Sequence, residues 1–252
     1  MKKISFFCVL LLLTVLSIPA QAGFTYVHAP ASGEQGIKSI IDQVYNVSTT
    51  ANIGGANSNA AQSYVDLSAG FTATRVSDYG LGGLLNLVSG TPTSADDKTW
   101  TDGIADIKAE AKFAAYSQEF GYYYSSIYTE LFDVTGDSYS VTGSGNVDFP
   151  EGSTWDWVRT GQGGTWYSNP SNNADYLDHM ITYQITGLGD DSTTWLVFWE
   201  DLKGNYSYCG SDRDFNDVVV EIKACVIPAP GAILLGSIGV TLVGWLQRKR
   251  IL

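Results

Sequence analysis

Histidine and cysteine, the residue types that most often supply nucleophilic or metal-dependent catalysis, are scarce in this chain. Its 252 residues include 2 histidines and 3 cysteines. The sequence also contains no H-E-x-x-H, no G-x-S-x-G and no phosphate-binding G-x-x-x-x-G-K pattern. These absences exclude the common signatures of zinc proteases, serine hydrolases and nucleotide-binding enzymes, and we expect a non-enzymatic protein.

Basic residues are also few, since 14 Lys and Arg face 26 Asp and Glu. Five of the basic residues lie in the first three and last five positions, so the part between carries nine basic and all 26 acidic residues, a net charge of −17. Such a surface repels DNA, RNA and anionic lipid, and we expect no nucleic-acid partner. It suits divalent cations, although acidity also keeps an exported protein soluble.

The N-terminus has the three parts of a secretory signal peptide. A short basic start, Met1-Lys2-Lys3, precedes an almost wholly apolar stretch over residues 4–18, and Ala20-Gln21-Ala22 is a small-residue cleavage site. The apolar stretch is short for a membrane-spanning helix. We therefore expect signal peptidase to remove residues 1–22.

The last 26 residues, 227–252, form a second targeting signal. The prolines of Pro228-Ala229-Pro230 cannot join a helix interior, the apolar run 231–246 can enter a bilayer, and Arg248-Lys249-Arg250 stays on the cytoplasmic side. We expect a single transmembrane helix that holds the rest of the chain outside the cytoplasm.

This segment resembles the PEP-CTERM sorting signal of exported bacterial proteins, with Ala229 where the commonest form carries Glu. The resemblance implies cleavage by an exosortase-type protease. It also implies an inner-membrane intermediate, which is then released to the cell surface or to an extracellular polysaccharide matrix.

Two cysteines remain between these signals, Cys209 and Cys225. In an oxidising compartment an even pair favours a disulfide, which would close a loop around the most acidic motif of the chain. Two free thiols are the alternative, because a disulfide requires that the two Cα atoms approach closely.

The central part of the chain has mainly β texture. One short helix is predicted where Ile37, Ile40, Ile41 and Val44 form an apolar stripe, ending near residues 45–46. Short runs of Thr, Val, Tyr, Phe and Trp, broken by Gly, Asn, Asp and Ser, then predict strands. Among these, residues 107–113 alternate, and residues 194–199 read as a strand buried on both faces.

We therefore predict an antiparallel β-sandwich of the jelly-roll kind. We place one β-rich region with the helix at residues 23–105 and a second β domain at residues 106–226.

The densest group of chemically able side chains lies near the end of this domain. Glu200 and Asp201 follow an apolar strand, and the segment Asp212-Arg213-Asp214-Phe215-Asn216-Asp217 precedes the last one. Hard oxygen ligands of this kind are what Ca²⁺ takes, roughly six to eight per ion. We predict Ca²⁺ ligands at Asp212, Asp214, Asn216 and Asp217, assisted by Glu200 and Asp201, with a solvated acidic turn as the alternative.

The loop is not an EF-hand, because the sixth and twelfth places counted from Asp212 hold Asp217 and Lys223 instead of Gly and Glu. The segments W-E-D-L at 199–202 and G-S-D-R-D-F-N-D-V-V-V at 210–220 resemble the family of the domain of unknown function DUF4114. Weaker matches at 118–123 and 178–183 extend the resemblance over about residues 107–224. It implies an extracellular β module with a Ca²⁺ loop, and it supplies no reaction.

Two alternative functions rest on other residues. Exposed aromatic rings at Trp155, Trp157, Trp166 and Tyr167 could stack on sugars, which would make the protein a carbohydrate-binding module. A secreted glycoside hydrolase would need only two carboxylates, for which Glu200 with Asp217 or Asp214 would serve. Our first hypothesis is an exported, Ca²⁺-binding surface or matrix protein that binds a polysaccharide or a surface protein.

Overall fold

The computed structural model describes residues 24–52, 59–76, 97–189, 193–204 and 211–224. The predicted signal peptide, the predicted transmembrane helix with its sorting signal, and the cysteine pair Cys209 and Cys225 lie outside these residues. Within the described ranges, no helix combines the length and the apolar character that crossing a membrane requires.

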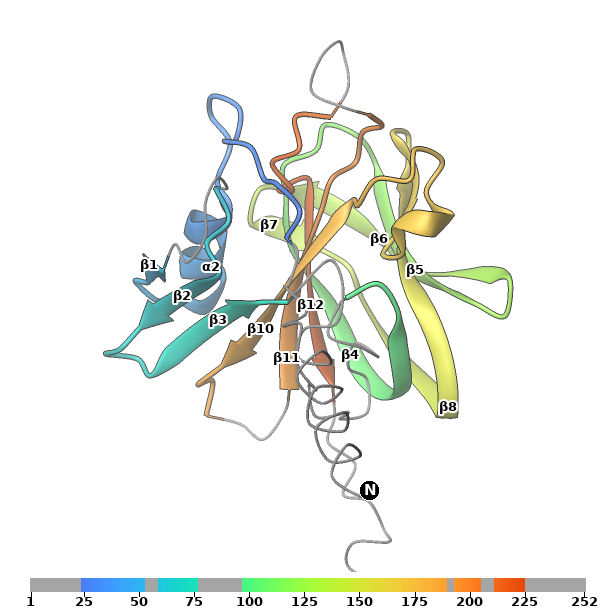
Figure 1. Cartoon of the computed structure of the whole chain (residues 1–252), viewed down its shortest axis with the longest axis horizontal. Helices are drawn as coiled ribbons and strands as arrows, with labels where there is room; N and C mark the ends of the chain where they lie inside the picture. Colours follow the sequence, from blue (N-terminus) through green and yellow to red (C-terminus); the bar gives the residue numbers. More distant parts are fainter. Residues whose placement is uncertain (1–23, 53–58, 77–96, 190–192, 205–210, 225–252) are drawn as a thin grey trace, which may run out of the picture.

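The described residues form one helix, one 3₁₀ turn and twelve strands in a single antiparallel sheet (Figure 1). The helix is α2 (Ile37–Tyr45) and the 3₁₀ turn is η1 (Pro170–Asn172). The strands are β1 (Thr50–Asn52), β2 (Ser63–Asp66), β3 (Phe71–Arg75), β4 (Trp100–Lys112), β5 (Gln118–Tyr124), β6 (Ile127–Asp137), β7 (Ser140–Thr142), β8 (Ser144–Gly161), β9 (Gly164–Tyr167), β10 (Met180–Thr186), β11 (Thr193–Trp199) and β12 (Val218–Ala224).

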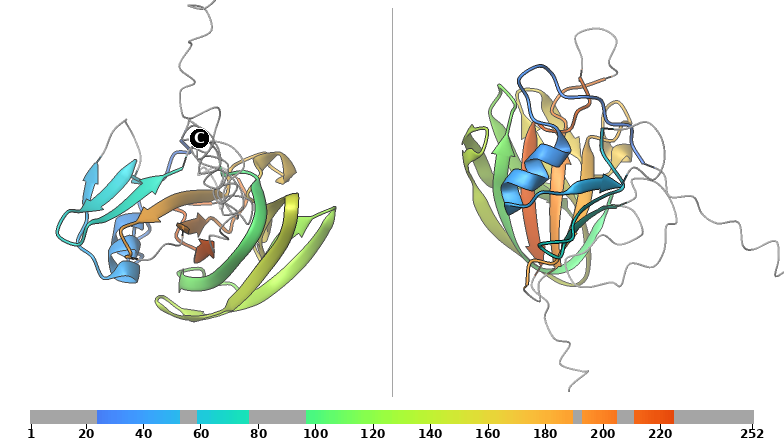
Figure 2. Two further views of the ribbon diagram at one scale, coloured as in Figure 1. Left: turned by 90° about the horizontal axis from the view of Figure 1, so that it is seen from below. Right: turned by 90° about the vertical axis from the view of Figure 1, so that its left-hand side faces the viewer.

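The strand order is β1-β2-β3-β10-β11-β12-β4-β8-β5-β6-β7, with β9 beside β8. The sheet curls, so that β4, β8, β5 and β6 form a layer over one face of β10–β12, while α2, β2 and β3 lie on the other side (Figure 2). The mainly β, antiparallel class with one short helix is thus confirmed. The layers pack as in a sandwich although one hydrogen-bonded path joins them, and the jelly-roll connectivity stays a prediction.

Strands β11 and β12 carry the centre of the molecule because both of their faces are apolar. Trp195, Val197 and Trp199 pack in one core cluster with the β4–β8–β5 layer, while Leu196 and Phe198 pack in the second cluster with α2. A strand that is buried on both faces needs a continuous apolar run instead of alternation. The reading of residues 194–199 as such a strand is confirmed.

Helix α2 follows its predicted stripe closely. Ile37, Ile40 and Ile41 are buried in the second core cluster, and the helix ends where Asn46 adopts the left-handed conformation with φ 52°. An Asn at this position ends a helix at small steric cost, because its side chain tolerates that region. The helix is thereby docked on the central strands through the face that the sequence shows.

The alternation predicted for residues 107–113 is only partly right. Ile107 and Ala109 face the first core cluster, but Ala111 faces the second. Between Ala109 and Ala111 the register with β12 shifts, because β4 contains one more residue than β12 along this stretch. A β-bulge of this kind turns the following side chains to the other face.

The boundary that we placed between residues 105 and 106 falls inside β4, which runs without interruption from Trp100 to Lys112. In addition, β3 pairs with β10 along four residue pairs, which continues the sheet from the N-terminal region into the C-terminal one. The described parts of both regions therefore share one sheet.

The tryptophans that we considered for sugar stacking belong to the protein interior. Trp155, Trp157 and Trp166 are at most 3% exposed, and Trp155 stacks on Phe149 with a centroid distance of 4.0 Å. Rings buried in this way present no face to a ligand, so this part of the stacking hypothesis is wrong. Tyr167 alone among the four residues is partly exposed.

Candidate metal centre

The ends of the two central strands bring three predicted ligands together. Trp199, the last residue of β11, pairs with Val218, the first residue of β12, so Glu200 and Asp201 leave the sheet beside Asp217. The backbone N–H of Asp201 donates to Asp217 Oδ2 at 2.7 Å. One carboxylate oxygen from each of Glu200, Asp201 and Asp217 lies within 4.8 Å of the others. We call these three residues the inner carboxylate group.

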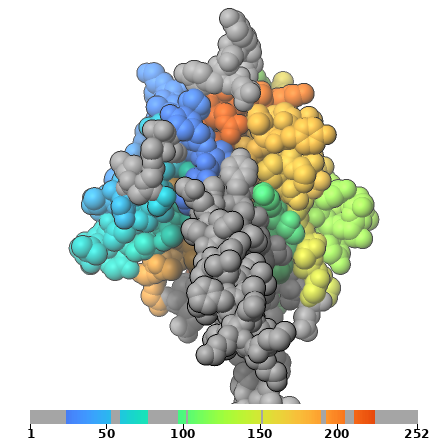
Figure 3. Space-filling view, viewed as in Figure 1, coloured from blue at the N-terminus to red at the C-terminus, as the bar shows by residue number. Residues whose placement is uncertain are grey.

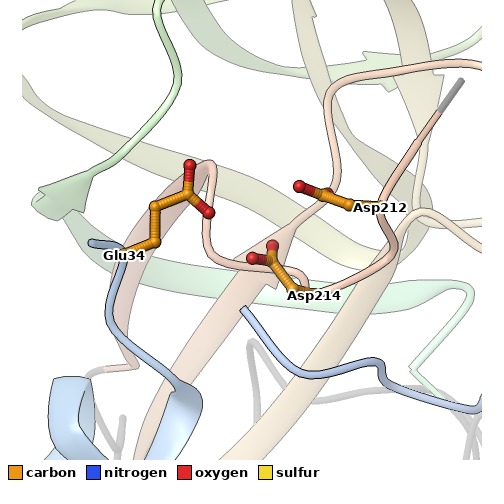
Figure 4. A group of neighbouring side chains, drawn as sticks. All are labelled: Glu34, Asp212 and Asp214. Carbon is orange, nitrogen blue, oxygen red and sulfur yellow. The ribbon is translucent and has the colours of Figure 1, made fainter. Parts of the chain in front are cut away.

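A second group forms at the surface beside the first. Asp212 and Asp214 come from the loop before β12, and Glu34 comes from the N-terminal segment that precedes α2. Their carboxylate oxygens also lie within 4.8 Å of one another, and the three side chains point toward a common centre (Figure 4). We call these residues the outer carboxylate group.

The loop that carries Asp212 and Asp214 has an unusual backbone. Arg213 and Phe215 both adopt positive φ angles, 56° and 59°, a region that costs a residue other than glycine energy. Local hydrogen bonds hold the turns: Ser211 Oγ accepts from the N–H of Arg213, and Asp214 Oδ1 accepts from the N–H of Asn216. The guanidinium of Arg213 lies over the Phe215 ring, 5.5 Å from its centroid.

The N-terminal segment is tied to this loop by hydrogen bonds. The N–H of His28 donates to the carbonyl of Arg213 at 2.9 Å, and the side-chain NH₂ of Asn216 donates to the carbonyl of Gln35 at 3.1 Å. The two segments lie side by side at the top of the molecule (Figure 3). Asn216 also donates to Asp214 Oδ2 at 2.7 Å, so it connects the outer group to the segment that carries Glu34.

Burial raises the pKa of the three inner carboxylates and of Asp212 and Asp214, so these five groups resist ionisation. Burial, followed by the charge of Asp212, raises the pKa of Glu200 to about 7 and that of Asp214 to about 8. Burial and then the charges of Glu200 and Asp201 raise the pKa of Asp217 well above its usual range. Burial and then Glu34 also raise the pKa of Asp212. The ionised forms therefore lack sufficient positive charge or hydrogen-bond donors in their surroundings.

One buried oxygen of the inner group finds no hydrogen-bond donor among the described residues. Glu200 is 1% exposed, and its Oε1 accepts from the N–H of Leu202 at 3.2 Å. Its Oε2 is buried, and no donor within the described ranges reaches it. A buried carboxylate oxygen without a partner carries a desolvation cost that a bound cation would remove.

A buried guanidinium supports the inner group from behind. Arg159 on β8 is fully buried, and its Nη1 donates to the carbonyl of Asp201 at 3.1 Å while its Nη2 lies 3.5 Å from Asp201 Oδ2. Gln118 donates to the same Oδ2 at 2.7 Å, and the Trp166 indole donates to the Asp201 carbonyl at 2.8 Å. These contacts fix the orientation of Asp201.

His179 lies behind the site as a hydrogen-bonded core residue. Its ring stacks on Trp166 at 3.9 Å, its Nδ1 lies 3.2 Å from the carbonyl of Glu200, and its Nε2 lies 3.1 Å from Asp175 Oδ2. Burial lowers the pKa of the imidazole, and Asp175 partly offsets this effect. The ring thus anchors the backbone of a predicted ligand.

Comparison with known proteins adds one family. Residues 138–225 match the family model described as "Domain of unknown function (DUF4114)". The DUF4114-like domain is thereby confirmed over a shorter range than we expected. The match includes the inner group with Asp212 and Asp214, whereas Glu34 lies outside it. No curated protein matches the chain.

Three of the solved structures that match part of the chain are bacterial lectins. The C-terminal domain of the BC2L-C lectin from Burkholderia cenocepacia is 14% identical, with a TM-score of 0.34, and the match covers 52% of this chain and 97% of that one. The Chromobacterium violaceum lectin CV2L, solved with α-methyl-fucoside, is 13% identical, with a TM-score of 0.36 and coverage of 52% and 99%. A high-affinity mannose-binding lectin from Ralstonia solanacearum is 16% identical, with a TM-score of 0.34 and coverage of 52% and 99%.

The structure therefore brings together five of the six predicted ligands in two groups, and it places the sixth, Asn216, beside the outer one. Whether Asn216 itself would bind a cation stays a prediction, because the NH₂ of its amide faces the carboxylates. Glu34 was missed, since nothing in its local sequence marks it and its contact with the loop depends on the tertiary fold.

Proposed function

We propose that this chain is an exported, non-enzymatic β module that binds Ca²⁺ at the two carboxylate groups. The observation that carries the proposal is the convergence of six carboxylates in two groups of three, with three of the six in the DRDFND segment, beside a buried Glu200 oxygen for which the described residues supply no donor. A donor set made only of carboxylate oxygens fits Ca²⁺ better than it fits zinc or copper.

The inner group would hold the ion most firmly, because Asp201 is oriented by Arg159 and Gln118 and Asp217 by the N–H of Asp201. The outer group would add ligands from Asp214, Asp212 and Glu34. The ion itself would supply two positive charges, which favour the ionised carboxylates. Without it, those carboxylates repel one another at close range.

A hydrolytic role receives no support from the geometry of the inner group. The Glu200 and Asp217 oxygens lie within 4.8 Å of each other. A glycosidase pair is separated by roughly 5–10 Å, which leaves room for the sugar and a water. Carboxylates as close as this could share one cation.

A carbohydrate ligand is the second part of the proposal, and the exposure of the outer group favours it. Glu34 and Asp212 are both partly exposed, in contrast to the buried Glu200 and Asp201. Ca²⁺ takes six to eight oxygen ligands, so an ion held at this rim retains positions for neutral oxygens from solution. Neighbouring hydroxyls of a sugar ring supply two such oxygens at once.

The route to the surface completes the proposal. The signal peptide would direct export, and the sorting signal would hold the chain in the inner membrane until an exosortase-type protease releases it. A disulfide between Cys209 and Cys225 would close the acidic loop after export, since an oxidising compartment favours it. A surface or matrix location also supplies the millimolar Ca²⁺ at which extracellular sites operate.

The sugar-binding claim can be tested on an array of neutral glycans that includes mannose and fucose. We expect binding in Ca²⁺ that EDTA abolishes, and a loss of about tenfold or more for Glu34→Gln, because the rim loses a charged ligand. Asp106→Asn, which changes an exposed carboxylate on β4, is the control and should bind as the wild type does. Equal binding in EDTA, or by the Glu34→Gln variant, would contradict an ion-mediated sugar site.

A further inference from the structure

The outer face of the β6–β5–β8–β9 layer presents a second surface that the cation site does not use. Its outward residues form three rows across the strands, because each residue pairs with an outward residue on the neighbouring strand. They are Glu119, Asp133, Thr160 and Thr165 in the first row, Gly121, Glu130, Val158 and Tyr167 in the second, and Tyr123, Tyr128 and Asp156 in the third. Residues between them, such as Phe120, Trp157 and Trp166, point into the first core cluster.

Three tyrosines gather at the centre of this face. Val158 is fully buried yet belongs to neither core cluster, so the side chains that cover it lie on the outer face. Tyr123 and Tyr167 meet edge to face, with ring centroids 5.3 Å apart. A Cβ added at Gly121 would come within 2.9 Å of the Tyr128 ring, so this ring lies over β5 at the glycine. All three tyrosines remain partly exposed.

The tyrosines are bordered by negative charge. Four of the eleven outward residues are carboxylates, and none is Lys or Arg. Asp156 is buried and accepts from Asn172 and Thr99, whereas Glu119, Glu130 and Asp133 are at least partly exposed. Within the described ranges, no Lys or Arg pairs with these three. Burial, Glu119, Glu130 and Asp133 together raise the pKa of Tyr128, which shows how near the charges lie to its ring.

We propose that this face, the tyrosine face, binds a glycan polymer of amino sugars whose amino groups are free and protonated. The flat rings of Tyr123, Tyr128 and Tyr167 would pack against the C–H faces of the sugar rings. The carboxylates of Glu119, Glu130 and Asp133 would pair with the ammonium groups, which the tyrosine faces also attract.

A glycan fits this face better than a basic peptide does. An extended peptide commonly binds by adding a strand to a sheet edge, where its backbone finds hydrogen-bond partners. Here β5, which carries Tyr123, pairs with β6 and β8 on its two sides, and the backbone N–H and carbonyl of Tyr167 bond to the Asn173 side chain, so the backbone at two of the three tyrosines is already paired. A sugar polymer needs only ring faces and charges, and both are present.

The test is calorimetric titration of the purified protein with a glucosamine hexamer in mildly acidic, low-salt buffer that contains EDTA. We expect binding that weakens about tenfold in Tyr123→Ala and in Tyr167→Ala, a change of about 1.4 kcal/mol. A similar loss is expected in the double variant Glu130→Gln with Asp133→Asn, which alters only exposed side chains and leaves the fold intact. Tyr116→Ala, in an exposed loop, should bind normally.

The fully N-acetylated hexamer, which lacks the charges, should bind less tightly than the amino form. The proposal is overturned if the hexamer does not bind, if the charge variant binds as the wild type does, or if a Lys-rich peptide binds equally well. It is also overturned if binding requires Ca²⁺, because the glycan would then occupy the carboxylate groups. Since EDTA is present throughout, failure of the proposed cation site would leave this result unaffected.

Discussion

Glu200→Gln should stabilise the protein when Ca²⁺ has been removed and should give little stabilisation when Ca²⁺ is present. In EDTA at about pH 8, the variant is expected to be more stable than the wild type by roughly 2 kcal/mol, because the buried Glu200 carboxyl, with a pKa of about 7, is costly to ionise. The amide keeps an oxygen for the N–H of Leu202 and presents an NH₂ to the neighbouring carboxylates. In Ca²⁺, the variant should gain little stability, since the ion loses a charged ligand.

Denaturant unfolding in EDTA and in millimolar Ca²⁺ measures both effects on the same samples. Glu130→Gln is the matched control, since it makes the same chemical change at an exposed site on β6 and should behave as the wild type in both buffers. A Glu200→Gln protein that is less stable in EDTA and still responds fully to Ca²⁺ would show that Glu200 serves packing alone.

Arg159→Met is expected to destabilise the protein by about 3–5 kcal/mol in EDTA, because it leaves the buried Asp201 carboxylate without its cationic partner. The Asp201 carbonyl would also lose its bond from Nη1. In saturating Ca²⁺ the loss should be smaller, because the bound ion supplies positive charge to the same carboxylate. The difference between the two buffers, obtained from denaturant midpoints, is the quantity of interest.

A Lys at position 159 keeps the charge but loses the branched contacts to Gly164, Asp201 and Gln118. We expect it to fall between the wild type and Arg159→Met in EDTA. If Arg159→Met lowers the free energy of unfolding by the same amount in EDTA and in Ca²⁺, the guanidinium acts by filling space. The electrostatic link between Arg159 and the metal centre is then wrong.

The inner carboxylate group could be predicted from sequence because it depends on local order. Glu200 and Asp201 directly follow one apolar strand and Asp217 directly precedes the next, so antiparallel pairing of those strands brings them together. The outer group could not be predicted in full. Glu34 reaches it through contacts between backbone groups of residues distant in the chain, such as His28 with Arg213, and no sequence pattern reports those.

The orientation of the aromatic residues could not be predicted from the sequence either. Trp155, Trp157 and Arg159 lie two positions apart along β8, so they share one face of the strand. An arginine on that face favours a face that is exposed to solvent. The structure buries all three, because Asp201 and Gln118 supply partners for the guanidinium from elsewhere in the fold. Similarly, the bulge opposite Val219 and Val220 turned Ala111 to the second cluster without any local signal in β4.

The most direct test of the cation site is thermal unfolding of the wild-type protein at about pH 8 and about pH 5.5, each with EDTA and with millimolar Ca²⁺. The folded-state pKa values of Glu200 and Asp214, about 7 and about 8, lie above those of the unfolded chain. Their contribution to stability is therefore present below about pH 4 and is lost as the pH rises toward about 8.

We expect the protein in EDTA to melt at a higher temperature at the lower pH. We also expect Ca²⁺ to raise the melting temperature by several degrees at about pH 8 and by less at about pH 5.5, where protons compete with the ion. An unchanged melting temperature in Ca²⁺ at about pH 8 would contradict the claim that these carboxylates form a metal centre.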